Sequence, residues 1–126
     1  SQNAEALAKD MLPKDFNIRS AGSIPANKVH KDAIQVMRDV GIDISKNSPK
    51  SIESLQKNFI SNLDYVITLC VEEVCPVVPE ATKVIHWPNE DPDNDNYSDI
   101  QSKNAFVKTR VNIFNLLKKF LVTENF

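Results

Sequence analysis

The sequence predicts an α/β fold in which helices cover both faces of a mostly parallel sheet, a three-layer sandwich. Apolar residues at helical spacing alternate along the chain with short apolar runs of strand length. The run 65–69 is almost entirely apolar, which is typical of a parallel strand buried on both faces. With 41% hydrophobic and 25% charged residues, the composition is that of one ordinary globular domain, residues 1–126.

The first half of the chain is expected to contain helices and one strand. A first helix ends near Pro13, and a half-buried edge strand is expected at 16–20, where apolar and polar residues alternate. A second helix covers about 33–40 and ends at Gly41, a position that favours positive φ. A short helix is expected at 50–57. The apolar stripe of the first helix consists of Ala4, Leu7, Ala8 and Met11.

The second half is expected to supply the central strands and a long helix. Strands are predicted at 65–69 and 83–87, and a final helix at about 102–122. Segment 89–98 is rich in carboxylates and asparagines, which indicates a solvated loop. The order of elements begins with a helix, whereas doubly wound sheets usually begin with a strand whose following loop carries the active site. The predicted domain is therefore incomplete at its N-terminal side.

Composition excludes several classes of function. Fifteen basic against 17 acidic residues give a net charge of -2, which argues against nucleic-acid and membrane-surface partners. Apolar stretches are too short to span a bilayer, and the polar amphipathic start does not resemble a signal peptide, so we expect a cytoplasmic protein. Two glycines are too few for a Rossmann fingerprint or a Walker phosphate loop.

The two cysteines, Cys70 and Cys75, follow the strongest predicted strand. In a regular helix a spacing of five residues spans about 7.5 Å. Disulfide-linked Cα atoms lie only about 4.4–6.8 Å apart, so a bridge requires a loop or a locally unwound helix. One interpretation is a switchable redox pair; the other is two buried thiols that act as small hydrophobic residues.

Asp91 follows the strand that ends at Trp87 and is expected at the same sheet edge as Cys70. It is a candidate general acid, and the alternative is a plain Asp-Pro turn. A zinc site formed by His86 and the cysteines would lack a fourth ligand. A calcium loop at 91–95 would lack the glycine and distal glutamate that such loops need. No metal site is therefore expected at these residues.

These motifs, in this order, resemble the thioredoxin-coupled arsenate reductases, which are relatives of the low-molecular-weight protein tyrosine phosphatases. The resemblance covers nearly the whole chain and implies a mostly parallel four-stranded sheet. It also implies a Cys-x5-Arg-Ser loop that cradles an arsenate-like or phosphate-like oxyanion. The segments that carry the resemblance are Ser1–Leu7, Ser20–Gly22, Ala33–Met37, Gly41–Ser45, Asp64–Cys70, Cys75–Pro76, His86–Trp87 and Asp91–Pro92.

The resemblance implies a role for each matching residue. A loop thiolate attacks arsenate, Cys70 then attacks the loop cysteine and releases arsenite, and Cys75 attacks Cys70. The resulting Cys70–Cys75 disulfide is returned to thioredoxin or a similar dithiol. Asp91 matches the general acid, and Ser1 matches the serine directly after the loop arginine.

The resemblance also implies a cation site but no tightly bound cofactor. Glu5 and Ser20 match two positions of a potassium site in that family. Lys50 stands where some members carry an acidic residue, and its ammonium could supply the positive charge itself. A potassium ion is therefore a candidate ligand.

The sequence departs from the family at the oxyanion loop. The residues six after Cys70 and Cys75 are Pro76 and Ala81, so neither cysteine heads a Cys-x5-Arg pattern. The family's first strand, its nucleophilic cysteine and its arginine have no counterpart in these residues, and we expect the chain alone to be inactive. The alternatives are a low-molecular-weight tyrosine phosphatase and a non-catalytic homologue with a regulatory or binding role.

Overall fold

The computed structural model describes residues 2–22, 28–71 and 77–126. The helices and strands follow the alternating order expected from the sequence. In chain order they are helix α1 (Gln2–Met11), helix α2 (Lys31–Arg38), a 3-10 helix (Ile52–Ser54), helix α3 (Lys57–Ser61), strand β1 (Tyr65–Cys70), strand β2 (Lys83–Asn89) and helix α4 (Asp99–Thr123).

The two strands are parallel and adjacent in the sheet. Tyr65 lies opposite Lys83, and the register continues until Thr68 lies opposite His86. It then shifts, so that Cys70 pairs with Asn89. Pro88 explains this irregularity, because it has no N–H to donate to the ladder. The carboxyl ends of both strands therefore meet at one edge.

The strand predicted at 16–20 is wrong, since these residues form no strand. Alternation describes side chains, whereas a strand also needs a backbone partner, and residues 16–20 have none within the described chain. Phe16 and Ile18 still pack against the core. The nearest sheet-like contact is an isolated bridge between Gly22 and Ser51. Because the described sheet has two strands, four strands stay a prediction.

Two helix boundaries differ from the sequence prediction. Helix α4 begins at Asp99 because Ser98 caps it, with a reciprocal hydrogen bond between the Gln101 side chain and the Ser98 backbone. The short helix expected at 50–57 is instead the 3-10 turn followed by α3. The positive φ expected at Gly41 is confirmed at 81°, but helix α2 ends three residues earlier, at Arg38.

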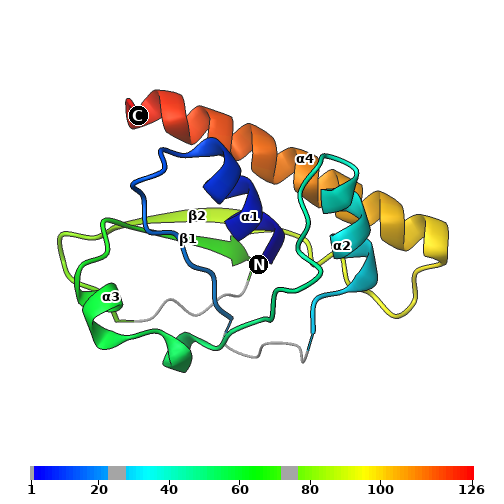
Figure 1. Cartoon of the computed structure of the whole chain (residues 1–126), viewed down its shortest axis with the longest axis horizontal. Coiled ribbons are helices and arrows are strands. Elements are labelled where there is room, and N and C mark those ends of the chain that lie inside the picture. Colours follow the sequence, from blue (N-terminus) through cyan, green and yellow to red (C-terminus); the bar gives the residue numbers. More distant parts are fainter. Residues whose placement is uncertain (1, 23–27, 72–76) are drawn as a thin grey trace.

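The core is formed by the sheet and helices α1, α2 and α4; in Figure 1, α1 and α4 lie above the strands, α2 to their right and α3 below. Tyr65, Ile67, Ile85 and Trp87 contribute the apolar side chains of the sheet. Among the described helices, none is long and apolar enough to cross a bilayer. The buried apolar side chains are Leu7, Ala8, Leu12, Ala33, Val36, Met37, Ile44, Phe106, Ile113, Leu117 and Phe120.

The end of α4 is fixed to the start of the sheet by polar contacts. The Tyr65 hydroxyl donates to Glu124 Oε1 at 2.6 Å, and Lys83 Nζ donates to Glu124 Oε2 at 2.9 Å. The hydrogen bond from Tyr65 lowers the pKa of Glu124, and Lys83 adds to this effect. The same hydrogen bond raises the pKa of Tyr65. Phe126 packs edge-on against Tyr65 and Phe120 beside this network.

Candidate active site

Cys70 and the start of the acidic loop lie at the same sheet edge. Cys70 is the last residue of β1, it is exposed, and its backbone partner is Asn89, two residues before Asp91. This is the edge at which open α/β sheets usually place their reactive groups. For Cys70, the exposed position excludes the interpretation of a buried thiol that serves only to fill the core. Cys75 and Ser1 lie outside the described residues.

Asp91 forms the turn that the sequence offered as the alternative to a general acid. Its Oδ1 accepts a hydrogen bond from the Asp93 N–H at 2.9 Å, which closes a turn across Pro92. Asp91 is exposed, and its Oδ2 makes no polar contact with the described residues. A protonated Asp91 can therefore keep Oδ1 in the turn and carry a donatable proton on Oδ2, so the two interpretations are compatible.

The His86 side chain contacts a neighbouring side chain on the same face of the sheet. Its Nδ1 contacts the Thr68 hydroxyl, and Thr68 is buried two residues before Cys70. Parallel pairing of Thr68 with His86 places these two side chains together. Among the described residues, no group of three or more His, Cys, Asp or Glu side chains could hold a metal ion.

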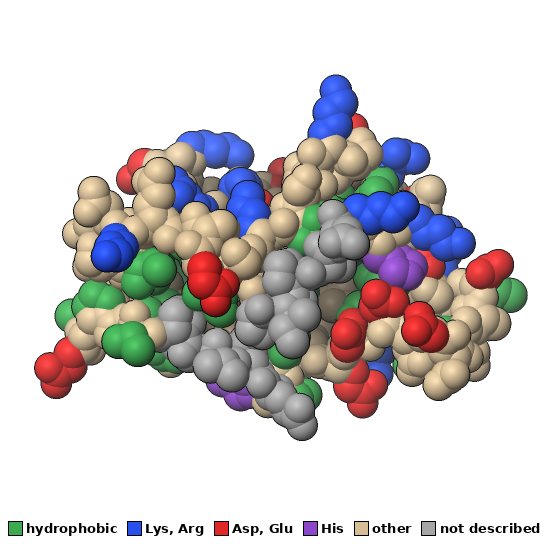
Figure 2. Space-filling model, turned by 90° about the horizontal axis from the view of Figure 1, so that it is seen from below, with side chains coloured by type: hydrophobic (Ala, Val, Ile, Leu, Met, Phe, Trp, Pro, Cys, Tyr) green, Lys and Arg blue, Asp and Glu red, His purple; other side chains and the backbone are tan. Residues whose placement is uncertain are grey.

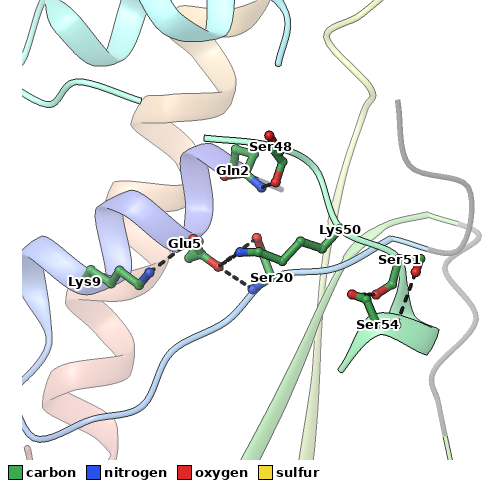
Figure 3. A network of polar contacts seen from close by, with 8 residues as sticks. All are labelled: Gln2, Glu5, Lys9, Ser20, Ser48, Lys50, Ser51 and Ser54. Atoms are coloured by element: carbon green, nitrogen blue, oxygen red, sulfur yellow. Dashed lines mark hydrogen bonds and ion pairs between the residues drawn. The ribbon is translucent and has the colours of Figure 1, made fainter. Parts of the chain in front are cut away.

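The three residues of the predicted cation site meet around one carboxylate (Figure 3). Glu5 lies on α1, with its side chain only 4% exposed. Ser20 donates to Glu5 Oε1 through its backbone N–H at 2.7 Å and through its hydroxyl at 3.1 Å. Lys50 Nζ lies 3.9 Å from the same oxygen. The structure thus brings these side chains together, whereas their role as a cation site remains a prediction.

A second lysine, which the sequence analysis missed, joins this cluster. Lys9 Nζ lies 3.3 Å from Glu5 Oε2, one helical turn along α1. The spacing of four residues between Glu5 and Lys9 is the signal that could have revealed it. Burial raises the pKa of Glu5, but the Ser20 N–H and the two ammonium groups outweigh that effect and leave the pKa below its ordinary value.

Backbone contacts hold the cluster in place. Gly22 N–H donates to Lys50 O at 2.9 Å, which fixes the segment of Lys50 beside that of Ser20. Gln2 Nε2 donates to Ser48 O at 3.0 Å and joins the same segment to the start of α1. Among the described residues, Asn3 Oδ1 and Gln2 Oε1 are buried acceptors without a hydrogen-bond partner, which the sequence gave no means to foresee.

A groove of about 1200 Å³ runs along β1. Residues 15–21 form one wall, β1 forms another, and Ala8, Leu12 and Leu117 contribute apolar side chains. Within the described sheet β1 pairs only with β2, so its other edge is open.

Comparison with known proteins places this geometry in a family. Residues 1–122 match the model of the low molecular weight phosphotyrosine protein phosphatases. An arsenate reductase 2 from Staphylococcus haemolyticus is 35% identical over 90% of this chain and 86% of its own length. An arsenate reductase from Staphylococcus aureus is 37% identical with the same coverage of both chains.

Solved structures agree with the sequence relatives. An arsenate reductase in its phosphate-binding state has a TM-score of 0.72 and 30% identity, with 98% of this chain and 88% of the other covered. A thioredoxin-dependent arsenate reductase from Corynebacterium glutamicum has a TM-score of 0.68 and 28% identity, with 98% of this chain and 56% of the other covered. The likeness therefore extends from the motifs to the arrangement of helices and strands.

Proposed function

Because this chain belongs to the low molecular weight phosphotyrosine protein phosphatase family and groups with its arsenate reductases, we propose that it serves the reduction of arsenate to arsenite. The observation that carries the proposal is the position of Cys70, exposed at the carboxyl end of β1 and next to the strand that leads into Asp91. Hydrolysis of a phosphate ester gives no role to an exposed thiol at this place. The substrate is an arsenate-like or phosphate-like oxyanion.

The proposed reaction moves two electrons from thiols to arsenic. A Cys-x5-Arg loop supplies the first thiolate, which attacks arsenic and forms an S–As bond while an oxygen leaves as water with a proton from Asp91. The Cys70 thiolate then attacks the loop sulfur. An S–S bond forms and the S–As bond breaks, with its electron pair left on arsenic, which departs as arsenite.

The second thiol of the pair completes the exchange. Cys75 attacks the Cys70 sulfur, which forms the Cys70–Cys75 disulfide and releases the loop thiolate. Thioredoxin or a similar dithiol reduces this disulfide and is itself oxidised. Such a cycle operates in a reducing compartment, so we assign the protein to the cytoplasm.

The cycle needs a cysteine thiol in the oxyanion loop, and these residues do not supply it. The 126 residues contain no Cys-x5-Arg pattern, and Ser1 would be the last residue of that loop. We therefore expect that these residues alone do not turn over arsenate but that the cysteine pair still exchanges with a dithiol.

The cluster around Glu5 requires no tightly bound cofactor in this proposal. Two lysine ammonium groups already lie within 4 Å of the single carboxylate. A further cation beside these ammonium groups would be repelled by them, although solvent weakens the repulsion because both lysine side chains are about half exposed. We propose that Lys50 supplies the charge that a potassium ion would otherwise bring.

The test is reduction of the oxidised chain by thioredoxin. The purified protein is oxidised, freed of oxidant and mixed with thioredoxin, thioredoxin reductase and NADPH. We expect NADPH consumption equivalent to one disulfide per chain, and expect Cys70→Ser and Cys75→Ser each to abolish it. Val71→Ala, at an exposed neighbour of Cys70, is the matched control and should leave it unchanged.

Two outcomes would overturn the proposal. The first is an oxidised chain that thioredoxin leaves unreduced. The second is consumption that persists in Cys75→Ser, because a pairing between chains would then replace the internal disulfide. Either result would favour the alternatives, a phosphatase or a non-catalytic binding protein, in which the pair has no redox role.

A further inference from the structure

His30 joins helix α2 to the loop that carries Asp91. Its Nδ1 accepts a hydrogen bond from the Asp32 N–H at 3.0 Å and so caps the first turn of α2. Because Nδ1 is an acceptor, the neutral ring carries its proton on Nε2. Nε2 lies 3.7 Å from Asp93 Oδ1. On the face seen in Figure 2, a histidine lies among acidic side chains.

Packing against α4 fixes the position of the His30 imidazole. Its ring lies against that of the buried Phe106, with centroids 4.6 Å apart and planes inclined by 30°. The Ser102 hydroxyl donates to Asp32 Oδ2 at 2.6 Å, and Arg110 donates to Val36 O at 2.7 Å. These contacts hold α2 against α4 and so fix the position of His30 Nε2.

Asp93 connects His30 to Asp91. Its N–H donates to Asp91 Oδ1, while its own carboxylate faces His30. Within residues 90–97 the other hydrogen bonds are local turns, such as Asn96 N–H to Asn94 Oδ1. In the described part of the chain, the contact with His30 is therefore the one polar link between this loop and another element.

We propose that His30 is a positioning residue for the Asp91 carboxyl group, acting through Asp93. The inference rests on the proposed function in that Asp91 is its general acid. A general acid must lie within hydrogen-bond reach of the departing oxygen, and Asp91 sits on an exposed loop whose own contacts are local. The link to His30 reduces the number of positions that the loop can adopt and keeps Asp91 at the edge that it shares with Cys70.

The test compares three variants of the whole chain. Asp93→Asn removes the charge that faces His30, and His30→Asn keeps an oxygen to cap α2 but does not reach Asp93. Asp95→Asn is the matched control, since it removes an equally exposed acid of the same loop that makes no side-chain contact with the described residues. Amide hydrogen exchange of Asp93 reports its bond to Asp91, and the carboxyl carbon-13 chemical shift reports Asp91 itself.

We expect the protection of the residue 93 amide from exchange, relative to its intrinsic rate, to fall about two- to fivefold in Asp93→Asn and His30→Asn, the effect of losing one weak, exposed polar contact. The Asp91 carboxyl signal should move in the same two variants and stay in place in Asp95→Asn. The proposal is overturned if the first two variants match the wild type, or if Asp95→Asn changes both signals as much. Neither measurement needs turnover, so the outcome is separate from that of the thioredoxin assay.

Discussion

Replacing Glu5 by glutamine tests the polar cluster most directly, because it removes the charge and keeps an oxygen of the same shape. The side chain is only 4% exposed and accepts two hydrogen bonds from Ser20. Hydrogen bonds to a charged group contribute about 1 kcal/mol more than neutral ones. Lys9 and Lys50 are 56% and 47% exposed, so solvent screens them and each adds at most about 0.5 kcal/mol.

These contributions give a loss of about 2–3 kcal/mol for Glu5→Gln, which for a domain of this size lowers the melting temperature by about 6–15 °C. Urea unfolding at neutral pH measures the loss. Glu53→Gln, at an exposed acid that makes no side-chain contact with the described residues, should change stability by less than about 0.5 kcal/mol.

The lowered pKa of Glu5 also predicts how the stability difference between wild type and Glu5→Gln changes with pH. The pKa of Glu5 in the folded chain lies below its ordinary value of 4.5, so the stabilisation is present above that value. It is lost as the pH falls through the lowered pKa. The difference between wild type and Glu5→Gln should therefore shrink at about pH 3. A difference that stays constant from neutral to acidic pH, or a variant as stable as wild type, would refute the electrostatic account.

Two further predictions concern other polar contacts. Lys50→Met removes one of the two ammonium groups at Glu5, so the melting temperature of this variant should rise more in potassium chloride than in an isotonic choline salt. The control Lys57→Met should behave as wild type, and an equal response of the two variants would contradict the role given to Lys50. Glu124→Gln replaces the charged acceptor of the Tyr65 hydrogen bond, the largest cause of the raised pKa of Tyr65, by a neutral one, so the tyrosine should ionise at lower pH in a spectrophotometric titration. An unchanged titration would show that this hydrogen bond does not form in solution.

The sequence predicted the elements that are determined by local pattern. The strands predicted at 65–69 and 83–87 correspond to β1 and β2, the first from an almost entirely apolar run, and Gly41 has the predicted positive φ, three residues after α2 ends. Residues 16–20 failed because a strand depends on a backbone neighbour that is distant in sequence. The start of α4 at Asp99 was readable in the spacing of Ser98 and Gln101.

The site was less accessible to sequence reasoning than the fold. Family resemblance, and not local pattern, predicted that Glu5, Ser20 and Lys50 lie together. Local pattern could not predict this contact, because 45 residues separate Glu5 from Lys50. The link from His30 to Asp93 could not be predicted, because it depends on how α2 packs against α4. Pattern identifies residues with suitable chemistry, whereas their distances depend on the packing of the whole domain.

The missing N–H of Pro88 has a consequence for the acidic loop. A proline withholds its hydrogen bond at every pH and in every redox state, so the irregular pairing just before the strand ends at Asn89 is set covalently. Oxidation or reduction of the Cys70 sulfur does not restore the missing donor, because the absence of an N–H belongs to the proline backbone.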